Sequence, residues 1–411
     1  MYPHFISCMK EQIINQGAAG CIYKYGLDCR GIQIGDDYIT KIQRNEKISD
    51  NEAVIGKKIS QIPYCSDHFA PVIECCDVNL AKYDSTEINK CDFIEKNKKK
   101  KKLYKMCKIP YVGQDTLADH IYDVFNHTPK QLVKTIASTY TYLLKSLKIL
   151  EDNNIIHYDI KENNIICNKH SNTPIIIDFG RSIDITQTKT NIDKYKDVFF
   201  VYQPDFDYWC LDINFLMYMF NEIGENWREK LVTEEIVLGI IDDFFRQTQM
   251  ATILQKLHPD YKTNQVAYFT KFVGKKWSVV FIELIKNVKT WDNYALAVTY
   301  LEFVMDFAEL RKAGEGEEGG GNQILRKYSD LLTFIIISTP DERLSIEETI
   351  TRTIELFSTK IDNDNIVKLH EKTKQLSKDA DFKRKLMFRH HKSKMDELVK
   401  DDMLDTHYGR V

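Results

Sequence analysis

The stretch IIHYDIKENNII, residues 155–166, constrains this chain more than any other part of its sequence. Isoleucine pairs at both ends favour burial, yet most positions between them are polar or charged. A turn held between two buried segments can present several polar side chains at one place, as binding and catalytic loops do. Its chemistry-bearing side chains are Asp159, Lys161, Glu162, Asn163 and Asn164.

A second signal follows in IIIDFG, residues 175–180. An apolar segment ends at Asp178, and Gly180 then allows the chain to turn. The Asp178 carboxylate and the Asn164 amide oxygen are ligands that Mg²⁺ accepts, together with phosphate and water. The sequence therefore predicts that Asn164 and Asp178 converge on a magnesium ion.

These two segments resemble the catalytic loop H-R-D-x-K-x-x-N and the D-F-G motif of the eukaryotic-type protein kinase family. The resemblance implies that Asp159 orients the substrate hydroxyl or accepts its proton, and that Lys161 lies near the transferred phosphate. It implies ATP and Mg²⁺ as cofactors, with Asn164 and Asp178 on the metal. It also implies an α+β bilobal fold, in which a small β-rich N-lobe with one main helix precedes a larger, mostly helical C-lobe.

The segment INQGAAGCIYK, residues 14–24, resembles the glycine-rich nucleotide loop of this family. Gly17 and Gly20 match its second and third glycines, and Ile22 matches the valine that follows. Asn15 stands where the first glycine is expected, and asparagine tolerates unusual backbone angles better than most residues. The resemblance implies that Asn15, Gly17, Gly20 and Ile22 cover the nucleotide.

The segment YITKIQ, residues 38–43, resembles the family's V-A-I-K strand and makes Lys41 the phosphate-contacting lysine. Residues 50–62 have the apolar spacing of a helix, and Asp50 is its expected N-cap. Glu52 on this helix is the predicted partner of Lys41.

KIPYVGQDTL, residues 108–117, resembles the hinge between the two lobes. Ile109 is expected to flank the adenine ring. Because Pro110 has no backbone N–H, the amides of Tyr111 and Val112 are the expected adenine donors.

The region VYQPDFDYWCLDINFL, residues 201–216, departs most from the family pattern. We align Pro204 and Asp205 with the end of its A-P-E motif, and Asp207 with the aspartate that begins its central buried helix. One residue then separates the two features, which predicts a shortened ledge for peptide substrates. TPDERLSIEE, residues 339–348, resembles the closing motif of the C-lobe, and Arg343 is expected to pair with Asp205.

The predicted boundaries place the N-lobe at residues 1–110, the C-lobe at 111–358 and a charged tail at 359–411. A long helix is expected from Pro129, because apolar residues from Leu132 to Ile149 recur on one face. The C-lobe includes a helical insertion and a flexible Gly/Glu linker near 313–322. The run KNKKKKK, residues 96–102, is expected to be a solvated loop.

Composition narrows the setting of the protein. The formal net charge of −3 provides no basic field for nucleic acid, so nucleic acid is an unlikely partner. The ten cysteines lack paired CxxC spacing, which makes a zinc site unlikely and favours reduced thiols over a disulfide framework. No apolar leader or run of about eighteen apolar residues is present, so we expect a soluble, intracellular protein without a membrane span. The abundant Lys, Ile and Asn resemble kinases of large DNA viruses or of AT-rich protists. The expected location is the cytoplasm, which for a viral protein means the host cell or the virion.

The function predicted from the resemblance is an ATP-dependent protein kinase, and Lys161 favours Ser/Thr substrates over Tyr. The first alternative is a kinase-fold phosphotransferase for small molecules, which the shortened ledge favours. The second is a nucleotide-binding pseudokinase scaffold, which the presence of Lys41, Asp159, Asn164 and Asp178 opposes. The protein substrate and the oligomeric state stay open.

Overall fold

The computed structural model describes residues 12–17, 20–80, 88–97, 103–125, 129–168, 171, 173–188, 192–313 and 321–358, and the structural statements below concern these residues. Contacts within the chain separate residues 1–357 from 358–411, next to the predicted start of the tail. The tail beyond 358, most of the lysine run and most of the Gly/Glu linker lie outside the described residues.

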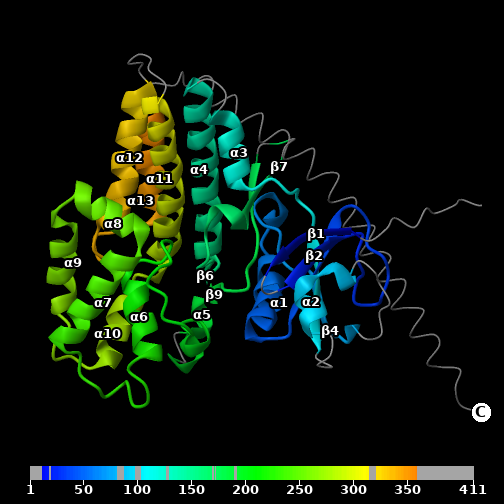
Figure 1. Ribbon diagram of the computed structural model, residues 1–411, viewed down its shortest axis with the longest axis horizontal. Helices are drawn as coiled ribbons and strands as arrows, with labels where there is room; N and C mark the ends of the chain where they lie inside the picture. The colour runs from blue at the N-terminus through cyan, green and yellow to red at the C-terminus, as the bar shows by residue number, and fades with distance from the viewer. Residues whose placement is uncertain are drawn as a thin grey trace, which may run out of the picture. The chain divides into compact units, whose positions relative to one another are not determined.

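A five-stranded antiparallel sheet forms the N-terminal part, in the order β1-β2-β3-β5-β4 (Figure 1). Its strands are β1 (Gln12–Gly17), β2 (Gly20–Lys24), β3 (Tyr38–Arg44), β4 (Glu74–Val78) and β5 (Tyr104–Pro110). Alternating side chains bury one apolar cluster on each face of the sheet. The strand predicted at 38–43 is confirmed as β3.

Helix α1 (Lys47–Ile59) is the main helix of the N-terminal part and confirms the helix predicted over 50–62, with an earlier start. Asp50 is not its N-cap. Glu46 takes that position, and the Ser49 hydroxyl accepts a hydrogen bond from the Glu46 N–H at 3.1 Å. Such a reciprocal cap satisfies the first helical N–H groups and moves the start ahead of the aspartate.

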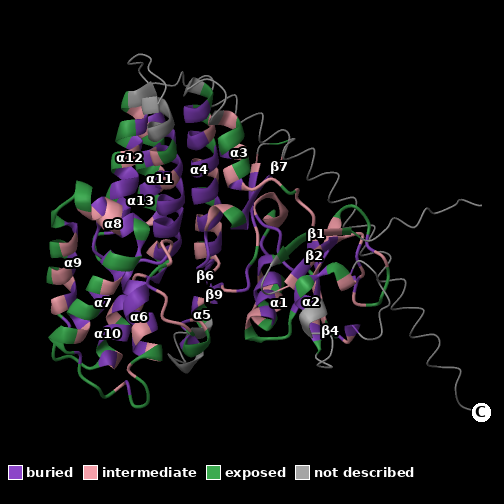
Figure 2. Ribbon diagram, viewed as in Figure 1, coloured by how far each residue is buried: buried purple, intermediate pink, exposed green. Residues whose placement is uncertain are grey.

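The rest of the chain is mostly helical, so the predicted α+β architecture is confirmed. A short helix, α2 (Asp92–Asn97), lies between β4 and β5. The helices after β5 are α3 (Leu117–Phe125), α4 (Pro129–Asp152), α5 (Ile185–Thr188), α6 (Leu211–Asn221), α7 (Glu234–Gln247), α8 (Gln249–Leu257), α9 (Asp260–Thr270), α10 (Trp277–Ile285), α11 (Trp291–Ala313), α12 (Gly321–Ile337) and α13 (Ile346–Ser358). The long helix predicted from Pro129 is α4. It packs beside α11 and α12 (Figure 1), and Figure 2 shows buried residues along all three.

Two small strand pairs position the opening stretch of the sequence. β6 (Ile155–Ile156) pairs with β9 (Ile183–Asp184), and β7 (Ile165–Asn168) pairs with β8 (Thr173–Ile176). All four flanking isoleucines are buried, as their composition predicts. The polar turn at 157–164 is thereby fixed beside the segment that begins at Asp178.

Three disulfides tie the N-terminal part together: Cys21–Cys91, Cys29–Cys76 and Cys75–Cys107. The expectation of reduced cysteines is therefore wrong for these six residues. The partners are 32 to 70 residues apart in the sequence, and only the sheet brings them together. Cys75 and Cys107, for example, lie opposite each other on β4 and β5. No local spacing carries that information.

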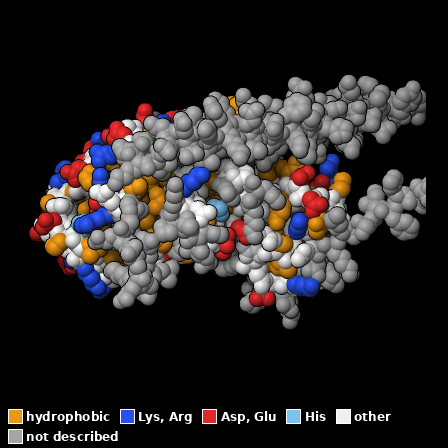
Figure 3. All heavy atoms as spheres, turned by 90° about the horizontal axis from the view of Figure 1, so that it is seen from above, with side chains coloured by type: hydrophobic (Ala, Val, Ile, Leu, Met, Phe, Trp, Pro, Cys, Tyr) orange, Lys and Arg blue, Asp and Glu red, His pale blue; other side chains and the backbone are white. Residues whose placement is uncertain are grey.

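The visible surface carries both signs of charge. On the face drawn in Figure 3, acidic and basic side chains are interspersed over the described residues, in keeping with a formal net charge of −3. Among the described helices, none combines the length and apolar character that a membrane crossing requires.

Candidate active site

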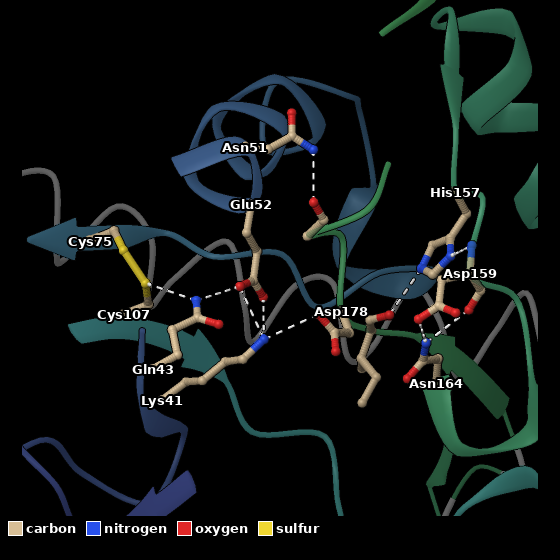
Figure 4. Close-up of polar contacts among 12 residues, drawn as sticks. Lys41, Gln43, Asn51, Glu52, Cys75, Cys107, His157, Asp159, Asn164 and Asp178 are labelled. Carbon is tan, nitrogen blue, oxygen red and sulfur yellow. Dashed lines mark hydrogen bonds and ion pairs between the residues drawn. A yellow bond between two sulfur atoms is a disulfide. The ribbon is translucent and has the colours of Figure 1, made fainter. Parts of the chain in front are cut away.

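Lys41, Glu52 and Asp178 meet at one point although they come from β3, α1 and the segment after β8 (Figure 4). The Lys41 ammonium donates to both Glu52 carboxylate oxygens at 2.9 and 3.0 Å, and to Asp178 Oδ1 at 3.1 Å. The Lys41 and Glu52 side chains are 15% and 3% exposed, whereas Asp178 is 44% exposed. The predicted pairing of Lys41 with Glu52 is present, and Asp178 keeps an accessible carboxylate.

The two carboxylates and the ammonium shift one another's protonation. Burial by itself lowers the pKa of the Lys41 ammonium, but Asp178 and Glu52 outweigh it and raise that pKa. The charge of Lys41 lowers the pKa of the exposed Asp178 carboxylate. Burial raises the pKa of Glu52, although Lys41 and Gln43 stabilise its ionised form. The site therefore holds a charged lysine and an ionised Asp178.

Gln43 is a residue of this cluster that the motifs did not reveal. Its side-chain amide donates to Glu52 Oε2 at 2.7 Å and to the Cys107 sulfur at 3.9 Å (Figure 4). Gln43 lies two positions after Lys41 on β3, so both side chains are on the same face. That spacing is the signal in the sequence that could have identified it.

Asp159 is held by two neighbours within the catalytic turn. Lys161 Nζ donates to both of its carboxylate oxygens at 3.1 Å, and Asn164 Nδ2 donates to Oδ2 at 2.9 Å and to the Asp159 carbonyl at 2.8 Å. Asp159 and Asn164 are buried, 7% and 6% exposed. The structure thus brings together the three residues predicted to be catalytic.

His157 joins this turn to the segment that carries Asp178. Its Nδ1 accepts from the Asp159 N–H at 3.3 Å, while its Nε2 donates to the Ile177 carbonyl at 3.0 Å. Its ring also packs edge-on against Phe179. The two segments are therefore connected through one fully buried imidazole.

Asp292, at the start of α11, holds the backbone of the same turn. Its carboxylate accepts from the backbone N–H groups of His157 and Tyr158 at 2.6 and 2.8 Å. Asp292 is therefore the aspartate that begins the central buried helix, and the prediction of Asp207 for that role is wrong. Asp207 instead accepts from the N–H of Met250. An aspartate followed by a long apolar helix in WDNYALAV was the signal.

Arg343 pairs with Asp212, not with Asp205 as predicted. Its Nη2 donates to Asp212 Oδ1 at 2.8 Å, and the two side chains are 2% and 0% exposed. The rest of α6 and helices α7 to α10 lie between Asp212 and Asp292, so the expectation of a single intervening residue is wrong. The short spacing around Pro204 had suggested an alignment that the buried contacts do not support.

Asp178 and Tyr158 both adopt left-handed backbone conformations, with φ of 63° and 67°. Such conformations are costly for residues other than glycine and concentrate at functional sites. Asn51 on α1 steadies the segment after Asp178, because its side chain donates to the carbonyls of Gly180 and Ser182 at 2.9 and 2.8 Å. This tether is a second contact that the motifs did not reveal.

Tyr158 stands at the arginine position of H-R-D. It is buried and stacks on Trp209, while its backbone carbonyl accepts from the Trp209 indole N–H at 3.0 Å. The guanidinium of Arg181 lies over the Trp209 ring, 5.6 Å from the ring centroid. Aromatic packing thus fills the place where the family pattern has a cation.

The glycine-rich segment forms the β1–β2 hairpin. Gly17 and Gly20 face each other in the register, as do Asn15 and Ile22, and Ile22 is also opposite Lys41 on β3. A Cβ atom at Gly20 would lie 2.2 Å from the Ile42 carbonyl oxygen, so the close approach of the strands requires glycine there.

The predicted hinge follows β5. Ile109 is buried in an apolar cluster, and Val112, Ile39 and Ile177 pack against that cluster half-buried. The Tyr111 N–H donates to the Asp37 carbonyl at 2.8 Å, so it is not available to adenine as predicted. The loop before β3 folds back on the end of β5, and the Val112 amide is the predicted donor that is left.

The donor set at Asn164 and Asp178 fits a magnesium nucleotide. The Asn164 side-chain nitrogen donates its hydrogen bonds to Asp159. The side-chain oxygen of Asn164 is therefore the atom left to face a metal. Asp178 supplies an accessible carboxylate. The described residues contain no cluster of three or more His, Cys, Asp or Glu suited to a metal. Mg²⁺ is commonly held by one or two carboxylates plus substrate phosphates, so such a cluster is not required.

Residues 10–209 match the family model of the protein kinase domain. The match includes the hairpin, Lys41, the catalytic turn and Asp178, and it ends before Asp212 and Asp292. No curated protein matches the sequence.

Proposed function

Because the chain belongs to the protein kinase family of phosphotransferases, we propose that it transfers the γ-phosphate of Mg-ATP to Ser or Thr hydroxyls of protein substrates. The observation that carries this proposal is the meeting of Lys41, Glu52 and Asp178, three residues separated by up to 137 positions. A nucleotide-binding pseudokinase scaffold would need this cluster too, but it has no evident need for an Asp159 carboxylate held in place by Lys161 and Asn164.

Each residue has a part that follows from its contacts. Lys41, positioned by Glu52, binds the nucleotide phosphates. Asn164 and Asp178 would hold Mg²⁺, which neutralises negative charge on the phosphates when bound. Asp159, fixed by Asn164, orients the substrate hydroxyl and accepts its proton. Lys161 lies against Asp159 and stabilises charge that develops on the transferred phosphate.

The hairpin and the hinge enclose the nucleotide in this proposal. Asn15, Gly17, Gly20 and Ile22 would cover the phosphates from β1 and β2. The apolar group around Ile109 and Val112 would contact the adenine ring.

A protein substrate is favoured over a small molecule by the same contacts. The small-molecule alternative was based on a shortened peptide ledge, which followed from the single residue between Asp205 and Asp207. Asp212 and Asp292 make the contacts expected of those two residues, so the argument for a short ledge no longer applies. Lys161, which resembles the lysine of Ser/Thr kinases, supports Ser/Thr specificity. The intracellular location stays a prediction from composition.

A radiolabelled ATP transfer assay with basic and acidic generic proteins tests the proposal. We expect Asp159→Asn and Asp178→Ala each to lose at least about 100-fold in transfer rate, the scale of losing an acid–base or electrostatic group. Glu283→Gln, at an exposed position that pairs with Lys286, is the control and should retain full activity. Undiminished transfer in both aspartate variants would show that the site is wrongly assigned.

Phosphoamino-acid analysis of the labelled products tests the specificity. We expect phosphoserine and phosphothreonine. A product that contains only phosphotyrosine contradicts the Ser/Thr assignment and leaves the phosphotransferase assignment intact.

A further inference from the structure

The Cys75–Cys107 disulfide lies next to the lysine cluster, on the strands that support it. Cys107 on β5 is directly opposite Lys41 on β3, and Cys75 is directly opposite Cys107 on β4. In Figure 4, Gln43 lies between the disulfide and Glu52, and Lys41 lies next to Glu52. Cys107 is fully buried and Cys75 is half-buried.

A continuous series of polar contacts joins this disulfide to Lys41. The Gln43 amide nitrogen lies 3.9 Å from the Cys107 sulfur and donates to Glu52 Oε2 at 2.7 Å. Glu52 in turn accepts from Lys41. Gln43 and Glu52 are 5% and 2% exposed, so water cannot readily replace a lost partner.

We infer that Cys75–Cys107 is a redox modification site through which thiol–disulfide exchange sets the position of Glu52 and so controls Lys41. With respect to nucleotide binding, the inference rests on the proposed function.

The other two disulfides do not share these contacts. The sulfurs of Cys29 and Cys76 lie 3.8 Å from the Met106 carbonyl oxygen. Cys21 and Cys91 belong to the apolar cluster on the opposite face of the sheet. They cross-link the same part of the chain and serve as matched controls.

The exchange needs a small dithiol as the reductant. One thiolate of the dithiol attacks the half-buried Cys75 sulfur, the Cys75–Cys107 bond breaks, and Cys107 leaves as a thiolate that takes up a proton. The second thiolate of the dithiol then displaces Cys75, which is protonated. The dithiol ends as a disulfide, and two electrons and two protons have passed to the two cysteines.

Reduction changes what Gln43 meets. A disulfide sulfur only accepts hydrogen bonds, whereas a thiol also donates. Two unbonded heavy atoms also need roughly 3.5–4 Å between them, and the close-packed interior around Cys107 has little free space. The new S–H group therefore favours the Gln43 carbonyl oxygen over its NH₂ group, and Glu52 loses a donor. Glu52 then holds Lys41 less firmly.

The reactivity of Lys41 toward an amine-acylating reagent tests this in the full chain without nucleotide. Peptide mass spectrometry follows acylation of Lys41, and cysteine alkylation shows which thiols are paired. We expect Cys75 and Cys107 to be protected before treatment with dithiothreitol. After treatment, Lys41 should be acylated about tenfold faster, the change associated with weakening one hydrogen bond to a charged group.

Three double variants identify the responsible bond. The response to dithiothreitol should persist in Cys21→Ser/Cys91→Ser and in Cys29→Ser/Cys76→Ser, and should be absent from Cys75→Ser/Cys107→Ser. Should the last variant fail to fold, Gln43→Leu replaces it, because without the amide the reductant has no route to Glu52. The inference is overturned if the acylation rate of Lys41 does not change on reduction. It is also overturned if the response to dithiothreitol disappears when either control disulfide is removed.

Fluorescent ADP with Mg²⁺ provides the second measurement. We expect binding about tenfold weaker after reduction, the loss associated with one hydrogen bond to a charged group. Absence of binding in both redox states contradicts the proposed function, and the acylation rate of Lys41 still decides the redox inference.

Discussion

The buried pair between Arg343 and Asp212 permits a quantitative prediction for the substitution Arg343→Leu. Arg343 donates to Asp212 and, at 3.0 Å, to the Thr290 hydroxyl. Asp212 also accepts from the Trp291 indole at 2.6 Å. Trp291 precedes Asp292, which anchors the catalytic turn. The Arg343–Asp212 pair is therefore connected to the active site through Trp291.

The expected cost follows from the charge that is left behind. Leucine fills much of the space of the arginine stem but leaves the Asp212 carboxylate without a counter-ion in a fully buried position. Removing one member of a buried ion pair costs about 3–5 kcal/mol. Since domains are commonly stable by only about 5–15 kcal/mol, this is a large share of the free energy of unfolding.

Urea denaturation of the purified variants measures the effect. We expect Arg343→Leu to lower the free energy of unfolding by about 3–5 kcal/mol. Adding Asp212→Asn should recover part of that loss, because the stranded charge is removed while an acceptor for Trp291 remains. Asp205→Asn, at the exposed position first expected to pair with Arg343, is the control and should change stability by less than about 0.5 kcal/mol. A double variant no more stable than Arg343→Leu would refute the reasoning, as would an equal loss in Asp205→Asn.

Three further predictions concern other contacts. Burial, followed by the charges of nearby carboxylates, raises the pKa of Glu302 to about 7, so the folded state holds that proton more tightly than the unfolded state. Stability should therefore fall as pH rises from 4.5 to 7, by at most about 3 kcal/mol, and Glu302→Gln should remove this fall in denaturation curves measured across that range. Gly20→Ala should lower the free energy of unfolding by about 1–3 kcal/mol, because the added Cβ meets the Ile42 carbonyl. Gly35→Ala, which has open space around it, should not lower it, and thermal unfolding of the two variants distinguishes them. Asn51→Ala should speed amide hydrogen exchange in residues 180–182 and lower activity, and unchanged exchange there would contradict the tether.

The parts of the site that lie close together in the sequence were predictable. Asp159, Lys161 and Asn164 lie within six residues, and the buried isoleucines on either side fix their turn. Lys41 and Glu52 are on consecutive elements, a strand that resembles the family's V-A-I-K strand and a helix that its apolar spacing identified. Residue type and spacing sufficed for these because local structure determines most of their geometry.

Contacts between distant segments were not predictable from one sequence. Asp292 is 135 positions from His157, and Arg343 is 131 positions from Asp212. Several aspartates in 205–212 have the right charge, and only burial distinguishes them. The disulfide pairings were not predictable for the same reason, because it is the register of β4 and β5 that places Cys75 opposite Cys107.

The left-handed backbone at Asp178 affects how substitutions at this position are interpreted. Alanine removes the carboxylate, but it must also adopt a conformation that costs most L-residues roughly 1–2 kcal/mol, whereas asparagine adopts it more readily. An inactive alanine variant therefore combines a chemical defect with a conformational one. Comparing it with Asp178→Asn separates the two, because the asparagine variant changes the charge and largely preserves the turn.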